Sequence, residues 1–399
     1  MKVAHVSDCY LPRLGGIERQ VHELAVRQRE AGHEVVVVTS VAGDAPAKGG
    51  RTDQGDTGAG GIDEKDTVEV FRPRAGHGGS PTRMRYEWTP LGCRLVLRGG
   101  FDVVHIHASS FSPLAFVTAG RCSAAGIPVA VTVHSLWANA SPLFRMADGI
   151  AKWGEWSVAW SAVSSPAAEP LRRILGQRSP VTIVPNGVDP PSWSVPDVAR
   201  TPGRVVVATV GRLALRKRPG PLLRMLREAR ARLPADIRLE AVLVGDGPLR
   251  RALQRYVESA GMEDWVTLRG SANHSDLRQL YADVDFYIAP ATLESFGIAA
   301  LEARCAGVPV VAHRSSGVSE FIVDGVDGVL TRGDSDMVDR IVHLAENAAL
   351  RERMRAHART VPPRVSWESV LGATDALYER ARALSAGGSR RGPKLTLSG

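Results

Sequence analysis

The strongest constraint on the fold is an uninterrupted β-branched run near the N-terminus. Residues 34–39 read EVVVVT, and a shorter apolar run, residues 3–7, precedes them. Between these runs lie two glycines and a segment, residues 17–25, whose apolar residues recur at helical spacing. Strand, glycine turn, helix and strand form a βαβ unit, which predicts a parallel sheet. Because the run is apolar at successive positions, that strand is expected to be covered on both faces.

The same alternation continues along most of the chain. Further strand-like segments of the first half are residues 68–72, 103–107, 129–134 and 181–184. A second series has strands at 204–210, 239–244, 265–269 and 286–289, with helical segments at 221–232, 249–260 and 275–282. Prolines 190, 191, 196 and 202 mark a stiff linker between the two series. Since 399 residues are too many for one ordinary core, we expect two α/β domains, over residues 1–195 and 196–363.

Composition narrows the class of protein and its surroundings. The formal net charge of +8 favours anionic ligands such as phosphates, nucleic acid or an acidic membrane. Four separated cysteines without a C-x-x-C motif predict neither a disulfide framework nor a zinc site, which favours a reducing, cytoplasmic location. The N-terminus does not resemble a signal peptide, and no apolar run reaches the roughly 18 residues of a membrane-spanning helix. Residues 386–399 are basic and small, and are expected to be disordered.

The segment LESFGIAALEARCAGVPVV, residues 293–311, places two glutamates, Glu294 and Glu302, around small and apolar residues. Ser295 or its neighbours are expected to begin a helix, and the amides of a helix N-terminus bind anions. Gly297 has no side chain that would keep a phosphate or ribose away from those amides. On such a helix Glu302 lies on the same side as Glu294, about 80° away and two turns further along. This predicts a ligand along the helix start; a solvent-exposed acid and a capping acid are the alternative.

A basic segment follows the first strand of the second series. Gly211 comes after that strand, and Arg212 and Lys217 follow, five positions apart. A diphosphate requires a positively charged clamp, and an Arg guanidinium supplies two parallel donors. We therefore expect Gly211, Arg212 and Lys217 to bind phosphate. Arg216 and Arg218 are expected to be solvated charges.

Two further features lie in the first domain. Gly15 and Gly16 follow the first strand, where glycines let a phosphate or a sugar approach a helix N-terminus, but they do not form a G-x-G-x-x-G motif. His107 and His134 end later strands, and open α/β sheets bind ligands at the carboxyl ends of their strands. A lone histidine at a strand end is more often structural. A functional His134 is the competing interpretation.

Taken together, these segments resemble the retaining GT-B glycosyltransferases of glycosyltransferase family 4. The resemblance covers nearly the whole chain, from GGIERQVHELAVRQREAGHEVVVVT through HIHASS, VTVHS, VPNGVD, VGRLALRKR and LVGDGP to LESFGIAALEARCAGVPVVA. It implies an α/β protein of the GT-B fold, with two Rossmann-like domains whose parallel sheets face each other across a cleft. It also implies a C-terminal helix, residues 364–385, that returns to the first domain.

The resemblance also implies roles for the candidate residues. Arg212 and Lys217 would bind the donor diphosphate and stabilise the leaving charge, and Glu302 would bind the ribose hydroxyls. Glu294 would contact the transferred sugar, and His134 would lie beside it at the reacting centre. The other expected contacts to the donor come from Gly16, Gly211, Ser295, Phe296, Gly297 and Ile298.

The chain departs from the family pattern in two places. Arg218 and Pro219 follow Lys217, where the family often has a glycine. Residues 42–66 form a glycine-rich insertion with almost no large apolar residue, which predicts a mobile loop. Asn186-Gly187 resembles an interdomain turn without a catalytic role.

The implied reaction is sugar transfer from a nucleotide-diphosphate sugar to a hydroxyl acceptor with retention of the anomeric configuration. A double displacement and a front-face path, in which the leaving phosphate helps to deprotonate the acceptor, are both open. No Asp-x-Asp-like metal segment stands out in a suitable loop, so neither a metal nor a cofactor is expected.

The donor and the acceptor are open to two interpretations. Arginines 13, 19, 27 and 29 at the first helix suit an anionic lipid, and the Arg-, Ala- and Gly-rich composition suggests a bacterial source. We therefore favour a GDP-mannose-dependent mannosyltransferase that acts on a lipid or lipid-linked glycan, with peripheral contact to the inner face of the plasma membrane. The alternative is a UDP-sugar transferase with a soluble acceptor, in which case the basic helix is a solvated face.

Other classes of protein compete with this interpretation. A nucleotide-sugar epimerase or a glycan phosphorylase would keep the fold, although Lys217 is not an obvious pyridoxal lysine. A catalytically inactive sugar-nucleotide sensor would keep the site. The basic charge alone suggests a nucleic-acid-binding protein, but no stripe of alternating aromatic and basic residues supports a nucleic-acid partner.

Overall fold

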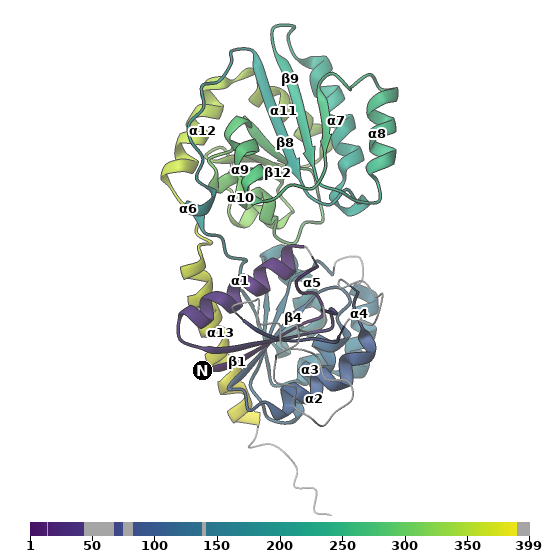
Figure 1. Cartoon of the computed structure of the whole chain (residues 1–399), viewed down its shortest axis with the longest axis vertical. Helices are drawn as coiled ribbons and strands as arrows, with labels where there is room; N and C mark the ends of the chain where they lie inside the picture. The colour runs from purple at the N-terminus through teal and green to yellow at the C-terminus, as the bar shows by residue number, and fades with distance from the viewer. Residues whose placement is uncertain (14, 44–67, 75–82, 138–140, 389–399) are drawn as a thin grey trace, which may run out of the picture. The chain divides into compact units, whose positions relative to one another are not determined.

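The computed structural model describes residues 1–13, 15–43, 68–74, 83–137 and 141–388. These form two compact units (Figure 1). Unit 1 comprises Met1–Gly187 and Glu368–Gly399, and unit 2 comprises Val188–Trp367. The glycine-rich insertion from residue 44 onward and the basic tail from residue 389 onward lie outside the described residues.

Unit 1 is built on a parallel sheet. Within the described ranges its strand order is β3-β2-β1-β4-β5-β6-β7. The strands are β1 Lys2–Ser7, β2 Glu34–Thr39, β3 Glu69–Phe71, β4 Val103–Ala108, β5 Val129–Val133, β6 Val158–Ala162 and β7 Val181–Ile183. The predicted βαβ unit is confirmed, because β1 and β2 pair in parallel from Lys2 with Glu34 to Ser7 with Thr39. The EVVVVT strand is buried from Val35 onward, as its composition predicts.

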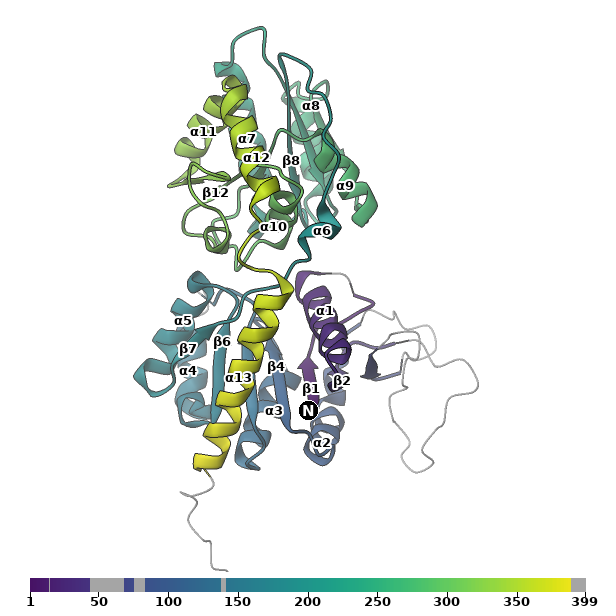
Figure 2. The same cartoon turned by 90° about the vertical axis from the view of Figure 1, so that its left-hand side faces the viewer.

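Helices cover both faces of this sheet. They are α1 Gly16–Glu30, α2 Thr89–Arg98, α3 Pro113–Ala124, α4 Ser141–Ala151, α5 Ser165–Leu175 and α13 Trp367–Gly388. One face packs against α1 and α13, where Val21, Leu377 and Tyr378 join Val3 and Val37 in a single apolar cluster. Figure 2 shows α13, in yellow, crossing the strands of unit 1.

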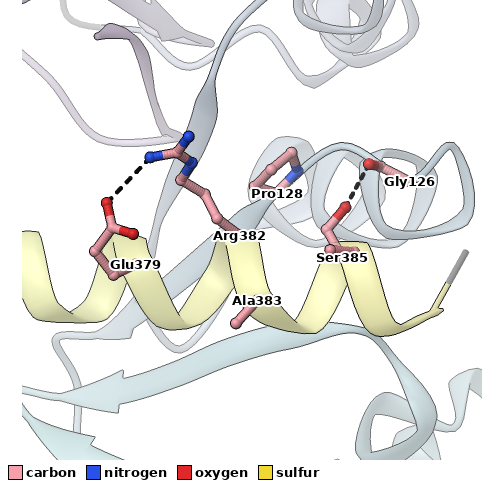
Figure 3. Close-up of a pocket in the computed structure, with 7 residues that line it drawn as sticks. Gly126, Pro128, Glu379, Arg382, Ala383 and Ser385 are labelled. Carbon is pink, nitrogen blue, oxygen red and sulfur yellow. Dashed lines mark hydrogen bonds and ion pairs between the residues drawn. The ribbon is translucent and has the colours of Figure 1, made fainter.

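Polar contacts as well as apolar ones attach α13 to unit 1. Ser385 donates a hydrogen bond to the carbonyl of Gly126, at the edge of the shallow surface hollow drawn in Figure 3. On the same helix Arg382 and Glu379 form a surface ion pair at 3.1 Å. The C-terminal helix is therefore an integral part of unit 1, although the whole of unit 2 intervenes in the sequence.

Unit 2 repeats the architecture with a different set of elements. Its parallel strand order in the described part of the chain is β10-β9-β8-β11-β12-β13. The strands are β8 Arg204–Val210, β9 Arg238–Val244, β10 Val266–Arg269, β11 Phe286–Ala289, β12 Val310–His313 and β13 Gly328–Thr331. The helices are α6 Pro190–Trp193, α7 Pro219–Arg232, α8 Arg250–Ser259, α9 His274–Asp283, α10 Ile298–Cys305, α11 Asp334–Glu346 and α12 Ala348–Thr360.

The proline-rich linker belongs to unit 2. Its short helix α6 buries Trp193, whose ring centroid lies 4.3 Å from that of His274 and 6.0 Å from that of Tyr281. The two units therefore divide after Gly187, whereas the composition placed the boundary after residue 195. The second division follows Trp367, because Trp367 still donates its backbone N–H to Val188.

Helix α10 is anchored by an ion pair that excludes water. The Arg304 guanidinium lies 2.9 Å from the Asp327 carboxylate, and both side chains are only 2% exposed. Arg304 also donates to the carbonyl of Ala358, and Asp327 accepts from the amide of Val323. Because each buried charge is paired and hydrogen bonded, removing one partner would leave the other uncompensated. The pair thus fixes the helix that carries Glu302.

Replacing Arg304 by Met is expected to destabilise unit 2 by about 3–5 kcal/mol, since Asp327 would remain buried and unpaired. Chemical denaturation followed by the fluorescence of Trp265 would measure this loss. Arg173→Met is the matched control, because its partner Glu169 and Arg173 itself are both more than half exposed. Equal stability of the two variants would contradict a structural role for the buried pair.

Candidate active site

The sheet of unit 2 reverses its winding direction between β8 and β11. The chain proceeds from β8 outward to β9 and β10, then returns to β11 on the other side of β8. Loops leaving the carboxyl ends of two such strands run in opposite directions, and ligands of open α/β sheets bind there. The predicted Gly211–Lys217 segment leaves β8 at this point, and the predicted glutamate segment follows β11. Topology thus brings the two candidate segments together.

Tyr287 of β11 joins the two strand ends. Its buried hydroxyl accepts a hydrogen bond from the amide of Val210 at 3.2 Å and donates to the carbonyl of Val210 at 3.1 Å. Burial raises the pKa of Tyr287, and the charges of Glu294 and Glu302 raise it further. Both glutamates therefore lie close enough to act on one hydroxyl. No pattern in the sequence marked this residue, because an aromatic in a buried strand is ordinary.

Lys217 and Glu294 form an ion pair across the reversal point. The Lys217 side chain is 43% exposed, while that of Glu294 is 15% exposed. A half-exposed ammonium remains accessible to a ligand, and the partly buried carboxylate fixes its position. Arg212 is exposed on the same loop. The structure therefore brings the predicted cations and Glu294 into one neighbourhood.

The helix of the glutamate segment begins later than the sequence predicted. Helix α10 starts at Ile298, and Gly297 precedes it with a φ of +94°. Glu294 and Ser295 consequently lie in the loop, so the helical angle expected between Glu294 and Glu302 does not apply. Glu302 is on α10 and buried. What relates the two carboxylates is the β11–α10 turn rather than a common helix face.

Gly297 is required by this turn. Its φ lies in the left-handed region, and a Cβ there would lie 2.6 Å from Val318 Cγ2. The neighbouring Phe296 side chain is buried, 5.4 Å from the ring of Phe321 between centroids. Phe296 can therefore offer a ligand only its backbone. Ser295 and Ile298, in contrast, are partly exposed on either side of it.

The loop after β8 is held by the loop after β9. The carbonyl of Asp246 accepts from the amide of Leu213, and the carbonyl of Leu213 accepts from that of Leu249. A Cβ on Gly245 would lie 2.1 Å from the carbonyl oxygen of Gly211, so only glycine permits this approach. The G-D-G-P segment thus supports the basic segment from below.

Arg218 is not the solvated charge that we expected. It adopts a left-handed φ of +55° and donates two hydrogen bonds to Asp334, at 2.6 and 2.8 Å. It also donates to the carbonyl of Pro290 at 3.1 Å. These contacts join the start of α7 to the loop after β11, which explains an arginine where a glycine was expected. Arg216 is exposed, as predicted, although it donates to the carbonyl of Leu293.

In unit 1, the predicted glycine turn opens α1. Gly16 is the exposed first residue of this helix. The Glu18 carboxylate folds back over the turn and pairs with Arg13 at 3.3 Å. Arg13 precedes the helix rather than belonging to it, and Arg27 pairs with Glu23 at 2.7 Å. The basic first helix therefore carries part of its charge in ion pairs.

His134 is not a lone histidine. It follows β5, and its Nε2 lies 3.0 Å from Nδ1 of His107, the end of the neighbouring strand β4. His107 Nε2 in turn lies 2.9 Å from Nδ1 of His5 on β1, and His105 packs beside both rings. All four rings are buried. The parallel register produces this cluster, since it places His5 opposite His105 and Ser7 opposite His107.

Burial also suppresses protonation of these rings. It lowers the pKa of His5 and of His134 to about 4, although hydrogen bonds with Gln28 and Asn186 respectively oppose the shift. The pKa values of His105 and His107 fall well below the ordinary value, because burial and the neighbouring histidines both disfavour charge. At neutral pH the cluster is uncharged.

Asn186 contacts this site, which the sequence did not suggest. Its buried side chain hydrogen bonds the His134 ring, whereas we expected only an interdomain turn at this position. The spacing along the chain could not reveal the contact, because Asn186 follows β7 and His134 follows β5.

Comparisons with known proteins agree with this geometry. Residues 196–361 match the model of the glycosyl transferases group 1, and residues 14–191 match Glycosyltransferase Family 4. The chain is a glycosyltransferase of GT-B type. The family part of the sequence-based prediction is therefore confirmed, as is the fold of two Rossmann-like domains with parallel sheets.

Individual relatives extend over much of this glycosyltransferase. It is 26% identical to a phosphatidylinositol N-acetylglucosaminyltransferase polypeptide of Arabidopsis thaliana, over 96% of this chain and 82% of the relative. It is 30% identical to a D-inositol 3-phosphate glycosyltransferase of Nocardia farcinica, over 68% of this chain and 64% of the relative. Anabaena Alr3699/HepE, solved in complex with UDP and glucose, has the same fold, with a TM-score of 0.70, 19% identity and coverage of 95% and 100%.

No helix among the described residues is both long and apolar enough to cross a bilayer. Within the same residues, His5, His105 and His107 are the group whose ligating atoms lie close enough to hold a metal ion, within 4.8 Å of one another.

The buried histidines predict that unit 1 loses stability in mild acid. Each folded-state pKa lies below its unfolded value, so the stabilisation is complete above about pH 6.5 and is lost as the pH falls toward 4. Each ring contributes up to about 1.4 kcal/mol per pH unit. Asp8, whose pKa is raised to about 6 by burial, acts in the opposite direction and offsets one ring between pH 6 and 4.

Hydrogen exchange measured by mass spectrometry, corrected for intrinsic rates, would test this at pH 7 and 5. Peptides from β1, β4 and β5 should lose more protection than peptides from β9 and β10, which carry no histidine. Equal losses in both groups would contradict the prediction.

Proposed function

We propose that this chain transfers a sugar from a nucleoside-diphosphate sugar to a hydroxyl of an acceptor that contains an inositol phosphate, with retention of the anomeric configuration. The observation that carries the donor half is the Lys217–Glu294 ion pair at the β8–β11 reversal. A half-exposed ammonium at such a point suits a diphosphate, whose departure requires positive charge placed in advance.

The ion pair also gives Glu294 two states. Before a donor binds, Glu294 holds Lys217 in position. A bound diphosphate competes for the Lys217 ammonium and is joined by the exposed Arg212 guanidinium. Glu294 is then available to accept a hydrogen bond from a hydroxyl of the transferred sugar. One carboxylate thus orders the site in advance and reads the donor.

Glu302 is suited to a different part of the donor. It is buried on α10, the helix that Arg304 anchors, and it lies close enough to Tyr281 and Tyr287 to raise the pKa of each. A fixed, desolvated carboxylate accepts strongly from a pair of hydroxyls. The ribose diol is the group of a nucleoside-diphosphate sugar that offers such a pair.

The acceptor half of the proposal is supported by the relatives. One is named for a phosphatidylinositol acceptor and another for D-inositol 3-phosphate, so the inositol phosphate is the chemistry that they share. Whether it is presented by a lipid or in solution is an outcome of the test. The pairing of Arg13 and Arg27 with acids weakens the argument for a lipid that rested on the basic first helix.

The donor base is part of the same proposal. Because one relative is named as an N-acetylglucosaminyltransferase and a solved neighbour holds UDP, UDP-sugars are the first donors to test. GDP-mannose, favoured by the basic composition alone, remains the comparison donor.

Turnover of UDP-N-acetylglucosamine, UDP-glucose and GDP-mannose should therefore be measured with myo-inositol phosphates and with phosphatidylinositol vesicles. Lys217→Met is expected to lower kcat/KM by roughly 10²–10³-fold, the size of the effect of removing one preorganised donor. Arg216→Met is the matched control, since it removes an exposed cation from the adjacent position.

Product formation with an inositol phosphate, with the anomeric proton coupling of the donor preserved, would support the proposal. Consumption of the donor without any acceptor would favour an epimerase instead. An equal loss in both variants would show that overall charge, rather than the Lys217–Glu294 pair, supports catalysis.

We further propose that transfer is independent of metal ions. Two Asp-x-Asp segments are already engaged: Asp334 and Asp336 pair with Arg218 and Arg340, and Asp285 accepts from the amide of Val206. Activity is therefore expected to survive dialysis against EDTA unchanged. Loss of activity that manganese restores would contradict this part of the proposal.

A further inference from the structure

A continuous hydrogen-bond path runs through the core of unit 1 and ends at His134. It begins at the backbone carbonyl of Val131 and passes through buried side chains from four strands and two helices. In order, they are Ser161, Thr132, His105, Tyr378, Gln28, His5, His107 and His134. None is more than 8% exposed, so water does not compete for these bonds.

The direction of each bond in this path is determined by the bond before it. A neutral imidazole has one N–H and one lone pair, so it donates at one nitrogen and accepts at the other. The four rings are neutral at pH 7, since burial lowers the pKa of each. Burial raises the pKa of Tyr378, which therefore keeps its single proton.

The first step is fixed by a group that can only accept. Ser161 Oγ donates to the carbonyl of Val131 at 3.0 Å, which uses its one proton. The bond between Ser161 and Thr132, at 2.7 Å, must then be donated by Thr132. Thr132 Oγ1 in turn accepts from His105 Nε2 at 2.7 Å. His105 is therefore protonated on Nε2.

The next steps pass through α13 and α1. The lone pair of His105 Nδ1 accepts from the Tyr378 hydroxyl at 3.0 Å. Tyr378 must then accept from the Gln28 amide nitrogen, also at 3.0 Å, and Gln28 Oε1 accepts from His5 Nε2 at 2.7 Å. The structure has the Gln28 amide in this orientation. It agrees independently with the direction set at Val131.

The last two steps repeat the same rule. Because His5 carries its proton on Nε2, its Nδ1 accepts from His107 Nε2 at 2.9 Å. His107 Nδ1 then accepts from His134 Nε2 at 3.0 Å. We propose that this path holds His134 as the Nε2–H tautomer with a lone pair on Nδ1, and that His5, His107, Gln28 and Tyr378 are its positioning residues.

The consequence for a ligand rests on the proposed function. A group that hydrogen bonds at Nδ1 of His134 must donate, whether it is the Asn186 amide or a hydroxyl of the bound sugar. His134 then reads the donor sugar as an acceptor, and does not supply a proton to it.

A metal ion on His5, His105 and His107 is the competing use of the cluster. Both ring nitrogens of each of these residues already take part in the hydrogen bonds above. A metal would have to break them, and the 2.9 Å contact between His5 and His107 is a hydrogen-bond distance. The path therefore accounts for the cluster without a metal.

The test is a ¹⁵N spectrum of the whole chain labelled on histidine, in which protonated and lone-pair nitrogens have well-separated shifts. His134→Gln identifies the His134 signals among the eleven histidines. The wild type should show His134 with Nε2 protonated and Nδ1 bare. A His134 protonated on Nδ1 would overturn the proposal.

Tyr378→Phe breaks the path by removing one oxygen atom. Gln28 then loses the acceptor that fixed its amide, so it can rotate and present either group to His5. His5, His107 and His134 should each show two tautomers, while His105 keeps its proton on Nε2 because Thr132 and Ser161 still hold it. Tyr256→Phe is the matched control, since the Tyr256 hydroxyl is buried without a hydrogen-bond partner among the described residues.

Gln28→Leu is a second break, two rings away from His134, and should mix the same tautomers. An unchanged His134 signal in both variants would overturn the path. If the wild type transfers sugar, kcat in Tyr378→Phe should fall roughly tenfold, because a wrong tautomer removes the ring from the reaction. Mixed tautomers with unchanged kcat would overturn the consequence for the ligand. Should no nucleotide sugar turn over, the proposed function fails while the spectra still decide the tautomer.

Discussion

Parallel strand pairing with one reversal of winding direction is the constraint on which both units depend. Parallel strands carry all their carboxyl ends to one edge of the sheet, and the reversal leaves two loops diverging at that edge. In unit 2 those loops hold Lys217 and Glu294, which lie 77 positions apart in the chain and nevertheless form an ion pair. Tyr287 joins the same strand ends through Val210. The candidate donor site is thus a property of the topology before it is a property of any side chain.

The supporting layer of this site is polar and buried. Arg304 and Asp327 anchor the helix of Glu302, and Arg218 joins α7 to the loop after β11. Unpaired, such charges would cost several kcal/mol each, so they are tolerated only where every partner is in place. This requirement makes the arrangement of the loops specific, because a shifted loop would leave a charge without its partner.

Unit 1 uses neutral groups for the same purpose. Its buried histidines come from adjacent strands, and α13 supplies Tyr378 from the far end of the chain. Since a neutral ring must donate at one nitrogen and accept at the other, a row of such rings has a direction. The return of the C-terminal helix to unit 1 therefore contributes a hydrogen-bonding group as well as apolar area.

Several elements were predictable from local pattern. The βαβ unit, the strands of the second series and the E-x7-E segment are recognisable because strand and helix periodicities and glycine turns are encoded by neighbours in the sequence. The donor-side candidates Arg212, Lys217 and Glu294 were found because they flank such turns. The start of α10 was placed too early, since a left-handed Gly297 delays the helix and no pattern in the sequence marks that φ.

By itself, the sequence determined the alternation of strands and helices, the division into two α/β parts and the candidate donor segments. Only the tertiary structure decided which polar groups meet. Arg218 became a brace through Asp334, Asn186 became a partner of His134, and four histidines became one cluster. The physical reason is that hydrogen bonds act over about 3 Å and have a direction, whereas these partners are separated along the chain and meet only through sheet register and helix packing.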